Sequence, residues 1–194
     1  MGSIVPSAGN NPPKNIYEQG WVSAVQLAEA VRHGHALPTQ ATSLVLGQGE
    51  VYHCGTTSHL AAYYGLDEVS YSTGGIIAGS TWKGMAATGA ASMIWSSRNR
   101  NRAQREAAAQ WRSLGEVPVH LTNHRMVVGI DGGLESLWLN GGITMFDPAF
   151  DQYAMHLQAD GGWPLLFEGP AVPYVAVILH ILLRGEVPAL PQYG

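Results

Sequence analysis

Apolar residues recur at helical spacing near both ends of the chain, which predicts two helices. The first is predicted over residues 16–33 and ends before Gly34. The second is predicted over residues 170–184 and ends before Gly185. Their apolar faces consist of Trp21, Ala24, Val25, Ala28 and Val31 in the first helix, and of Tyr174, Val177, Ile178 and Ile181 in the second.

Short runs rich in β-forming residues follow the first helix, and Gly or Asp separates them. These runs predict strands at 43–46, 50–54, 59–64 and 68–72.

Alternating apolar and polar residues return between residues 117 and 168 and predict an antiparallel meander. Its strands are expected at 117–122, 125–130, 134–140, around 153–157 and at 163–167. Asn-Gly and Asp-Gly between alternating segments are strong hairpin signals. The three turns of this kind are Asp131-Gly132-Gly133, Asn140-Gly141-Gly142 and Asp160-Gly161-Gly162.

The stretch 74–95 differs from both patterns, because Lys83 is its one charged residue and small residues dominate it. A helical stripe within it predicts a helix. A second helix is predicted where Ala103, Ala107 and Trp111 repeat every four residues. The stripe consists of Trp82, Met85, Ala86, Gly89 and Met93.

Composition adds that the chain has few charges and enough apolar residues for a core. Charged residues make up 12% of its 194 residues and apolar residues 46%, whereas about 25% charged is usual. The apolar content argues against a chain that is disordered overall, since such chains are poor in apolar residues. The net charge of −4 argues against a generally cationic nucleic-acid binder. Half of the ten Lys and Arg residues nevertheless form one run: Arg98, Arg100, Arg102, Arg105 and Arg112.

Candidate chemistry is sparse. Cys54 is the single cysteine, which excludes an intramolecular disulfide and a Cys-rich zinc site. On a strand His53 and Cys54 point to opposite faces and cannot easily share a metal. Ser58 and His59 are neighbours in sequence, but a catalytic triad is built in space, and no Gly-x-Ser-x-Gly elbow is present. We therefore predict no catalytic residue, no metal ligand, no cofactor and no enzymatic activity.

Several residues in the second half of the chain carry a family resemblance. They are Trp111-Arg112, the segment 119–128 with its Thr122-Asn123-His124-Arg125 turn, Trp138, the segment 162–167, and Gly169-Pro170 before the last helix. With these residues the chain resembles the pleckstrin-homology-like (PH-like) superfamily, especially its GRAM-like members in actinobacteria and their phages. The resemblance implies a bent antiparallel sheet of about seven strands closed at one end by a C-terminal helix. It also implies binding of phosphoinositides or protein segments rather than catalysis.

Together these observations predict an α+β fold, a strongly bent antiparallel sheet (a PH-like barrel or roll) capped by a C-terminal helix. Residues 1–40 are expected to form an extension with one helix, and residues 41–185 the PH-like domain. A helical insertion is expected at about 74–112, and a tail at 186–194. The N-terminal residues lack the basic and apolar regions of a secretory signal, so a cytoplasmic location is expected.

The sequence favours a binding module that recognises a protein partner, or a second copy of itself, through the insertion. The expected contacts are Trp82, Met85, Met93 and Trp95, supported by Arg98, Arg100, Arg102 and Arg105. A peripheral protein that binds anionic lipid through the same insertion is the alternative, because arginines follow a weakly charged stretch. An unrecognised enzyme is a third. Nucleic acid is not an expected partner, since aromatic residues flank the arginine run without interleaving it.

Overall fold

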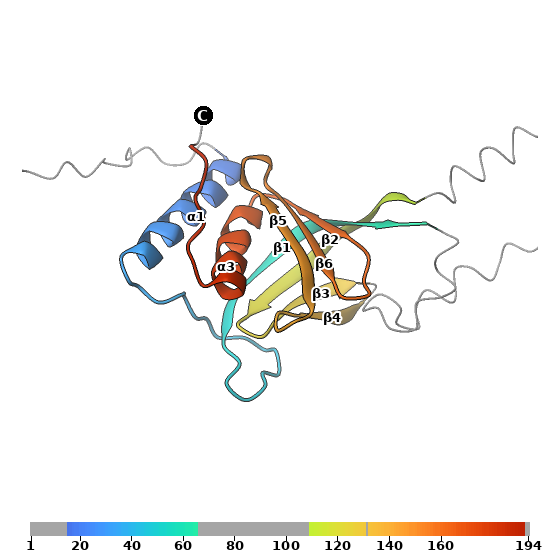
Figure 1. The fold of residues 1–194 in the computed structure, drawn as a ribbon, viewed down its shortest axis with the longest axis horizontal. Helices are drawn as coiled ribbons and strands as arrows, with labels where there is room; N and C mark the ends of the chain where they lie inside the picture. The colour runs from blue at the N-terminus through green and yellow to red at the C-terminus, as the bar shows by residue number, and fades with distance from the viewer. Residues whose placement is uncertain (1–14, 66–108, 131, 193–194) are drawn as a thin grey trace, which may run out of the picture.

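The computed structural model describes residues 15–65, 109–130 and 132–192 as two α-helices, a 3-10 helix and seven strands (Figure 1). The predicted α+β fold, with a bent antiparallel sheet and a C-terminal helix, is confirmed at this level. The elements are α1 (Ile16–Arg32), β1 (Tyr52–Tyr64), β2 (Gln110–Thr122), β3 (Arg125–Ile130), β4 (Gly133–Trp138), β5 (Ile143–Ala149), η3 (Phe150–Gln152), β6 (Ala154–Ala159), β7 (Leu165–Glu168) and α3 (Val172–Arg184).

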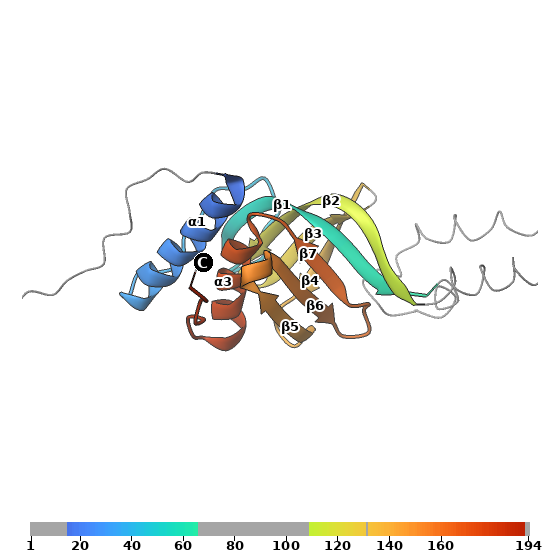
Figure 2. The same cartoon turned by 90° about the horizontal axis from the view of Figure 1, so that it is seen from above.

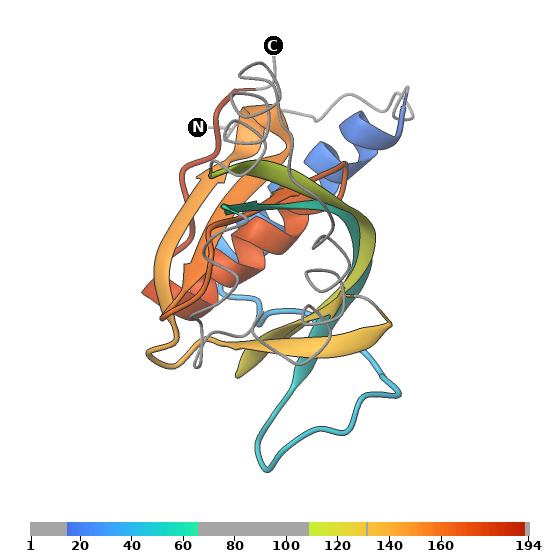
Figure 3. The ribbon, with the colours of Figure 1, turned by 90° about the vertical axis from the view of Figure 1, so that its right-hand side faces the viewer.

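The strands form one antiparallel sheet in the order β4-β3-β2-β1-β7-β6-β5. This sheet curls into a half-barrel (Figure 3). The long strand β1 lies at its centre and pairs with β2 along most of its length, and with β7 between His59 and Ala62. Residues distant in sequence therefore meet across β1.

Helix α3 lies at one end of the curled sheet, and α1 packs against α3 (Figures 1 and 2). Buried α3 residues such as Ile178 and Leu179 share one core with Leu60, Leu121 and Phe167 of the sheet. The helix ends as predicted at Gly185, which has a φ of 72° and donates its N–H to the carbonyl of Ile181 at 2.8 Å.

Helix α1 begins where Asn15 caps it, since its Oδ1 accepts the backbone N–H of Glu18 at 2.9 Å. Its buried face includes Trp21, Ala24 and Ala28, which confirms the predicted apolar stripe. Gly20 faces the start of α3 so closely that an added Cβ would collide with the carbonyl of Pro170. The absence of a side chain at this position lets the two helices approach.

The predicted strand at 43–46 is wrong, because these residues lie in the loop between α1 and β1. Val45, which suggested a strand, is 89% exposed. Local polar contacts fix the loop instead. The amide of Leu44 donates to Oγ1 of Thr42 at 3.1 Å, and the amide of Gly47 donates to Oε2 of Glu50 at 2.7 Å.

The two predicted strands at 50–54 and 59–64 fall on the single strand β1, which begins at Tyr52 and not at Glu50. Gly55 suggested a break between them, but it serves a close approach. An added Cβ at this position would collide with the hydroxyl of Tyr52, which lies 3.0 Å from Nδ1 of His120. The predicted strand at 68–72 lies outside the described residues.

Among the elements after residue 100, predicted strands are confirmed, one predicted helix is partly wrong, and one strand is not predicted. The strands predicted at 117–122 and 125–130 are present as the end of β2 and as β3. The helix predicted through Trp111 is wrong at that residue, which is in β2; Ala103 and Ala107 lie outside the described residues. Strand β5 is absent from the prediction, because it is a half-exposed edge strand that contains Pro148 and lacks regular alternation.

Candidate functional site

The eight residues predicted to contact a partner lie between Trp82 and Arg105, outside the described residues. The described residues nearest to them in sequence are the ends of β1 and β2, which run side by side away from the body of the sheet (Figure 2). The last pair of this ribbon joins Tyr64 to Gln110. The sheet surface beside this pair therefore adjoins, along the chain, the segment that contains the predicted contacts.

An exposed aromatic cluster occupies this face of the ribbon. Tyr63 and Trp111 are directly opposed, and their ring centroids lie 5.5 Å apart in an edge-to-face arrangement. The Trp111 ring also lies 5.7 Å from that of His156 on β6. Tyr63 is 41% exposed and Trp111 42%. We name these three residues, Tyr63, Trp111 and His156, the stem patch. They present apolar area beside the last pair of the ribbon.

A polar relay adjoins the stem patch on the same face. Nε2 of His59 lies 2.8 Å from Oγ of Ser113, and its Nδ1 lies 3.4 Å from Oε2 of Glu168. Strand register explains the arrangement. His59 of β1 is opposite Glu168 of β7, and Ser113 of β2 is opposite Ala61 of β1, two residues after His59. Both the imidazole and the carboxylate are half-exposed. The relay therefore presents polar groups to solvent in a defined order.

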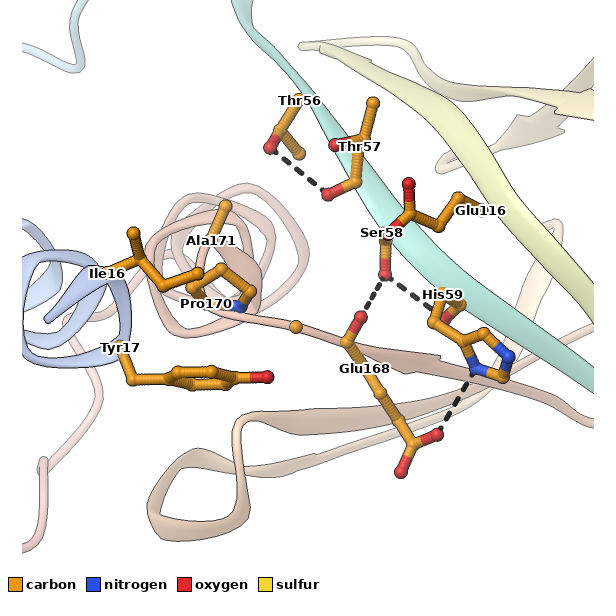
Figure 4. A pocket seen from close by; sticks show the side chains of 11 residues that line it. Ile16, Tyr17, Thr56, Thr57, Ser58, His59, Glu116, Glu168, Pro170 and Ala171 are labelled. Atoms are coloured by element: carbon orange, nitrogen blue, oxygen red, sulfur yellow. Dashed lines mark hydrogen bonds and ion pairs between the residues drawn. The ribbon is translucent and has the colours of Figure 1, made fainter.

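A groove of about 530 Å³ runs from this relay toward the start of α1 and α3 (Figure 4). Its floor is β1, where the hydroxyl of Ser58 donates to the backbone carbonyl of Glu168 at 2.9 Å. Two carboxylates, Glu116 and Glu168, and the imidazole of His59 line it. The groove therefore favours cationic or hydrogen-bond-donating groups. Its wall facing β1 includes Ile16, Tyr17, Pro170 and Ala171.

A second hollow, of about 370 Å³, lies farther along β1 and includes Cys54 in its lining. Burial raises the pKa of this thiol from 9.0 to about 12. The thiolate is the reactive form of cysteine, so Cys54 is an inert core residue. The neighbouring His53 is held by the loop before β1, since its Nδ1 lies 2.8 Å from the carbonyl of Pro38.

Arg125 is held by a buried carboxylate. Its Nε donates to Oε1 of Glu50 at 2.8 Å, and the Glu50 side chain is 1% exposed. Burial would raise the pKa of Glu50, but it is outweighed by hydrogen bonds from Arg125, Gly47 and Thr122 and by the Arg125 charge. The pKa falls from 4.5 to about 2. This network joins the loop before β1 to the β2–β3 turn and has a structural role.

The histidines do not gather into a metal site within the part of the chain that the structure describes. No three His, Cys, Asp or Glu side chains converge there as metal ligands. His120 instead contacts the hydroxyl of Tyr52, and Nδ1 of His33 lies 2.7 Å from the carbonyl of Glu29.

Comparison of the chain with protein-family models, curated proteins and solved structures finds no match. Neither α1 nor α3, the α-helices of the described residues, is long and apolar enough to cross a membrane.

Sequence reasoning missed the relay because its members lie far apart along the chain. His59 and Ser113 are 54 positions apart, and Glu168 lies on a third strand. The sequence draws attention to Ser58 beside His59, but the hydroxyl of Ser58 binds backbone carbonyls instead of the imidazole. Alternation along β1 shows which face of the strand His59 is on. The residues that His59 contacts depend on strand order and register.

Proposed function

We propose that the chain is a PH-like binding module that recognises a protein partner through the segment 74–110 and the stem patch at its base. Two features of the fold support the family part of this proposal. The sheet is antiparallel, curled and seven-stranded, and α3 lies at its end. Both features are what the resemblance in sequence implies. Domains of this kind mostly bind other molecules.

The exposed pair of Tyr63 and Trp111 is the observation that carries the binding proposal. Each ring is about two-fifths exposed although the two contact each other. Tyr and Trp are enriched among the residues that dominate protein interfaces, where their burial supplies much of the affinity. The pair sits next to the ends of β1 and β2, so a partner bound to segment 74–110 has this apolar surface within reach.

Charge favours a protein over an anionic membrane as the partner. Arg125 is the one Lys or Arg between residues 113 and 183, and Glu50 already neutralises it. Glu116 and Glu168 lie near the stem patch, on strands that pair with β1. Their carboxylates would repel anionic headgroups beside the stem patch. The partner is therefore expected to meet the stem patch with apolar and basic groups, and to meet Arg98, Arg100, Arg102 and Arg105 with acidic ones.

The test is affinity capture from a lysate of the organism that encodes the chain. Wild type is compared with a variant in which a short turn replaces residues 66–108, and with Trp111→Ala. The turn variant is feasible because β1 and β2 remain paired up to Tyr64 and Gln110. Trp138→Ala is the matched control, since Trp138 is 52% exposed and lies on the edge strand β4.

We expect a protein captured by wild type and Trp138→Ala to be lost from the turn variant and at least tenfold weaker with Trp111→Ala, about 1.4 kcal/mol. If the partner is a second copy, native mass spectrometry shows the same dependence in the assembly. Equal capture by all four proteins would contradict the proposal. Binding to anionic vesicles with no protein captured would favour the membrane alternative.

A further inference from the structure

The order of donors and acceptors in the relay is that of an activated serine. The backbone N–H of Gly115 donates to Oγ of Ser113 at 3.2 Å. Oγ of Ser113 lies 2.8 Å from Nε2 of His59, and its hydroxyl donates to this nitrogen when the imidazole proton is on Nδ1. Glu168, 3.4 Å from Nδ1, favours the tautomer with the proton on that nitrogen. Nε2 is thereby left as the acceptor, which is what a general base requires.

The backbone holds the serine and the histidine in this geometry. A β-bulge between Leu60 and Ala61 shifts the register of β1 against β2, so that Gly115 and Ser113 are opposite consecutive residues of β1. Gly115 has a φ of 85°, a conformation that L side chains rarely adopt. The shift brings Ser113 toward His59, whose own opposite residue is Glu116. Two paired strands are a more rigid support for such a site than loops are.

We propose that Ser113 is a nucleophile that takes acyl groups from small neutral esters, an activity separate from partner binding. Oγ of Ser113 attacks the ester carbonyl carbon and gives its proton to Nε2 of His59. The tetrahedral intermediate collapses, the bond to the leaving oxygen breaks, and that oxygen takes the proton from His59. Water then attacks the acyl-serine with His59 as base, which releases the carboxylic acid and restores Ser113.

The surroundings of Ser113 define the class of ester. Ser113 is exposed and lies on the same strand face as Trp111, two residues before it, so an acyl or aryl group can rest on the indole. Glu116 and Glu168 disfavour negatively charged substrates. The relay is half-exposed, and water weakens electrostatic stabilisation of the transition state. The proposal is therefore confined to esters with good leaving groups and to modest rates.

The full chain is tested with p-nitrophenyl acetate and p-nitrophenyl butyrate. We expect wild type to release p-nitrophenolate about 10 to 100 times faster than Ser113→Ala or His59→Gln, at or below the lower end of general-base effects because the relay is half-exposed. Glu168→Gln is expected to lie between them. Ser23→Ala on α1 is the control and is expected to match wild type. Thermal unfolding of each variant checks that the fold is retained.

Peptide mapping of the acetylated wild-type chain tests the nucleophile without any substitution. The chain is exposed briefly to the ester, and the reaction is then quenched at low pH. The proposal requires that the acetyl group is found on Ser113. Acetylation confined to lysine or to the N-terminus, or equal hydrolysis by wild type and Ser113→Ala, would overturn it. Neither result bears on the partner, because capture in the Trp111→Ala experiment is measured without an ester.

Discussion

Tyr63 and Trp111 are opposite each other across the β1–β2 ladder, with their ring centroids 5.5 Å apart. The next pair of the ladder is Tyr64 with Gln110, the last before the chain leaves the described residues. A pair of exposed aromatic rings thus marks the base of the segment that the sequence singles out for partner contacts. The proposed function depends on this juxtaposition.

Gly20 allows α1 to approach α3, so Gly20→Ala is expected to destabilise the protein. In an ordinary helix this substitution gains about 1 kcal/mol. Here the methyl group would meet the carbonyl of Pro170, and forcing the helices apart costs about 2 kcal/mol, as overpacking does. Urea unfolding measures the change.

The matched control is Gln26→Ala, at an exposed position of the same helix. It is expected to change stability by less than about 0.5 kcal/mol. A Gly20→Ala protein as stable as wild type would mean that α1 does not pack on α3 at this distance.

Glu50 stabilises the fold through Arg125, so Glu50→Gln is expected to cost about 2 kcal/mol near neutral pH. The folded-state pKa of Glu50 is lowered from 4.5 to about 2. A lowered acidic pKa contributes stability above the unfolded value, and this contribution is lost as the pH falls toward the folded value. The difference between the two proteins should therefore shrink between pH 4.5 and about 2.

Urea titrations of wild type and Glu50→Gln across this pH range check the prediction, because other carboxylates affect both proteins alike. A constant difference in unfolding free energy at all pH values would show that the stabilisation by Glu50 does not depend on its charge.

Cys54 is expected to resist thiol reagents in the folded protein. Burial raises its pKa to about 12, so the reactive thiolate is scarce at neutral pH. The reaction with Ellman's reagent should be slow in buffer and fast in urea, and its rate should follow the unfolded fraction. Rapid modification of the folded chain would show that the hollow beside Cys54 admits the reagent to an ionised thiol.

The sequence is informative wherever a pattern is local. The apolar stripe of α1, the stop at Gly185 and the strand at 125–130 depend on neighbours within a few residues, and each prediction is confirmed. Gly55 misleads because a strand glycine can mark either a break or a close approach. The close approach at Gly55 is made by the side chain of Tyr52, whose hydroxyl contacts His120. This contact is visible only in the structure.

The candidate site is less predictable because strand order and register determine it. Trp111 fits a helical repeat with Ala103 and Ala107 in the sequence, yet it is in β2 opposite Tyr63. Likewise His59 meets Ser113 and Glu168 because β1 lies between β2 and β7. Local spacing contains no information about either contact.

Photo-crosslinking in living cells tests the central claim most directly. A benzophenone amino acid is placed at Trp111 in one protein and, in the control, at Trp138, the second exposed tryptophan of the part of the chain that the structure describes. The account predicts a crosslinked protein adduct from position 111 that is absent from position 138 and that mass spectrometry identifies as one partner or a second copy. No adduct at position 111, or the same adducts from both positions, would contradict recognition at the stem patch.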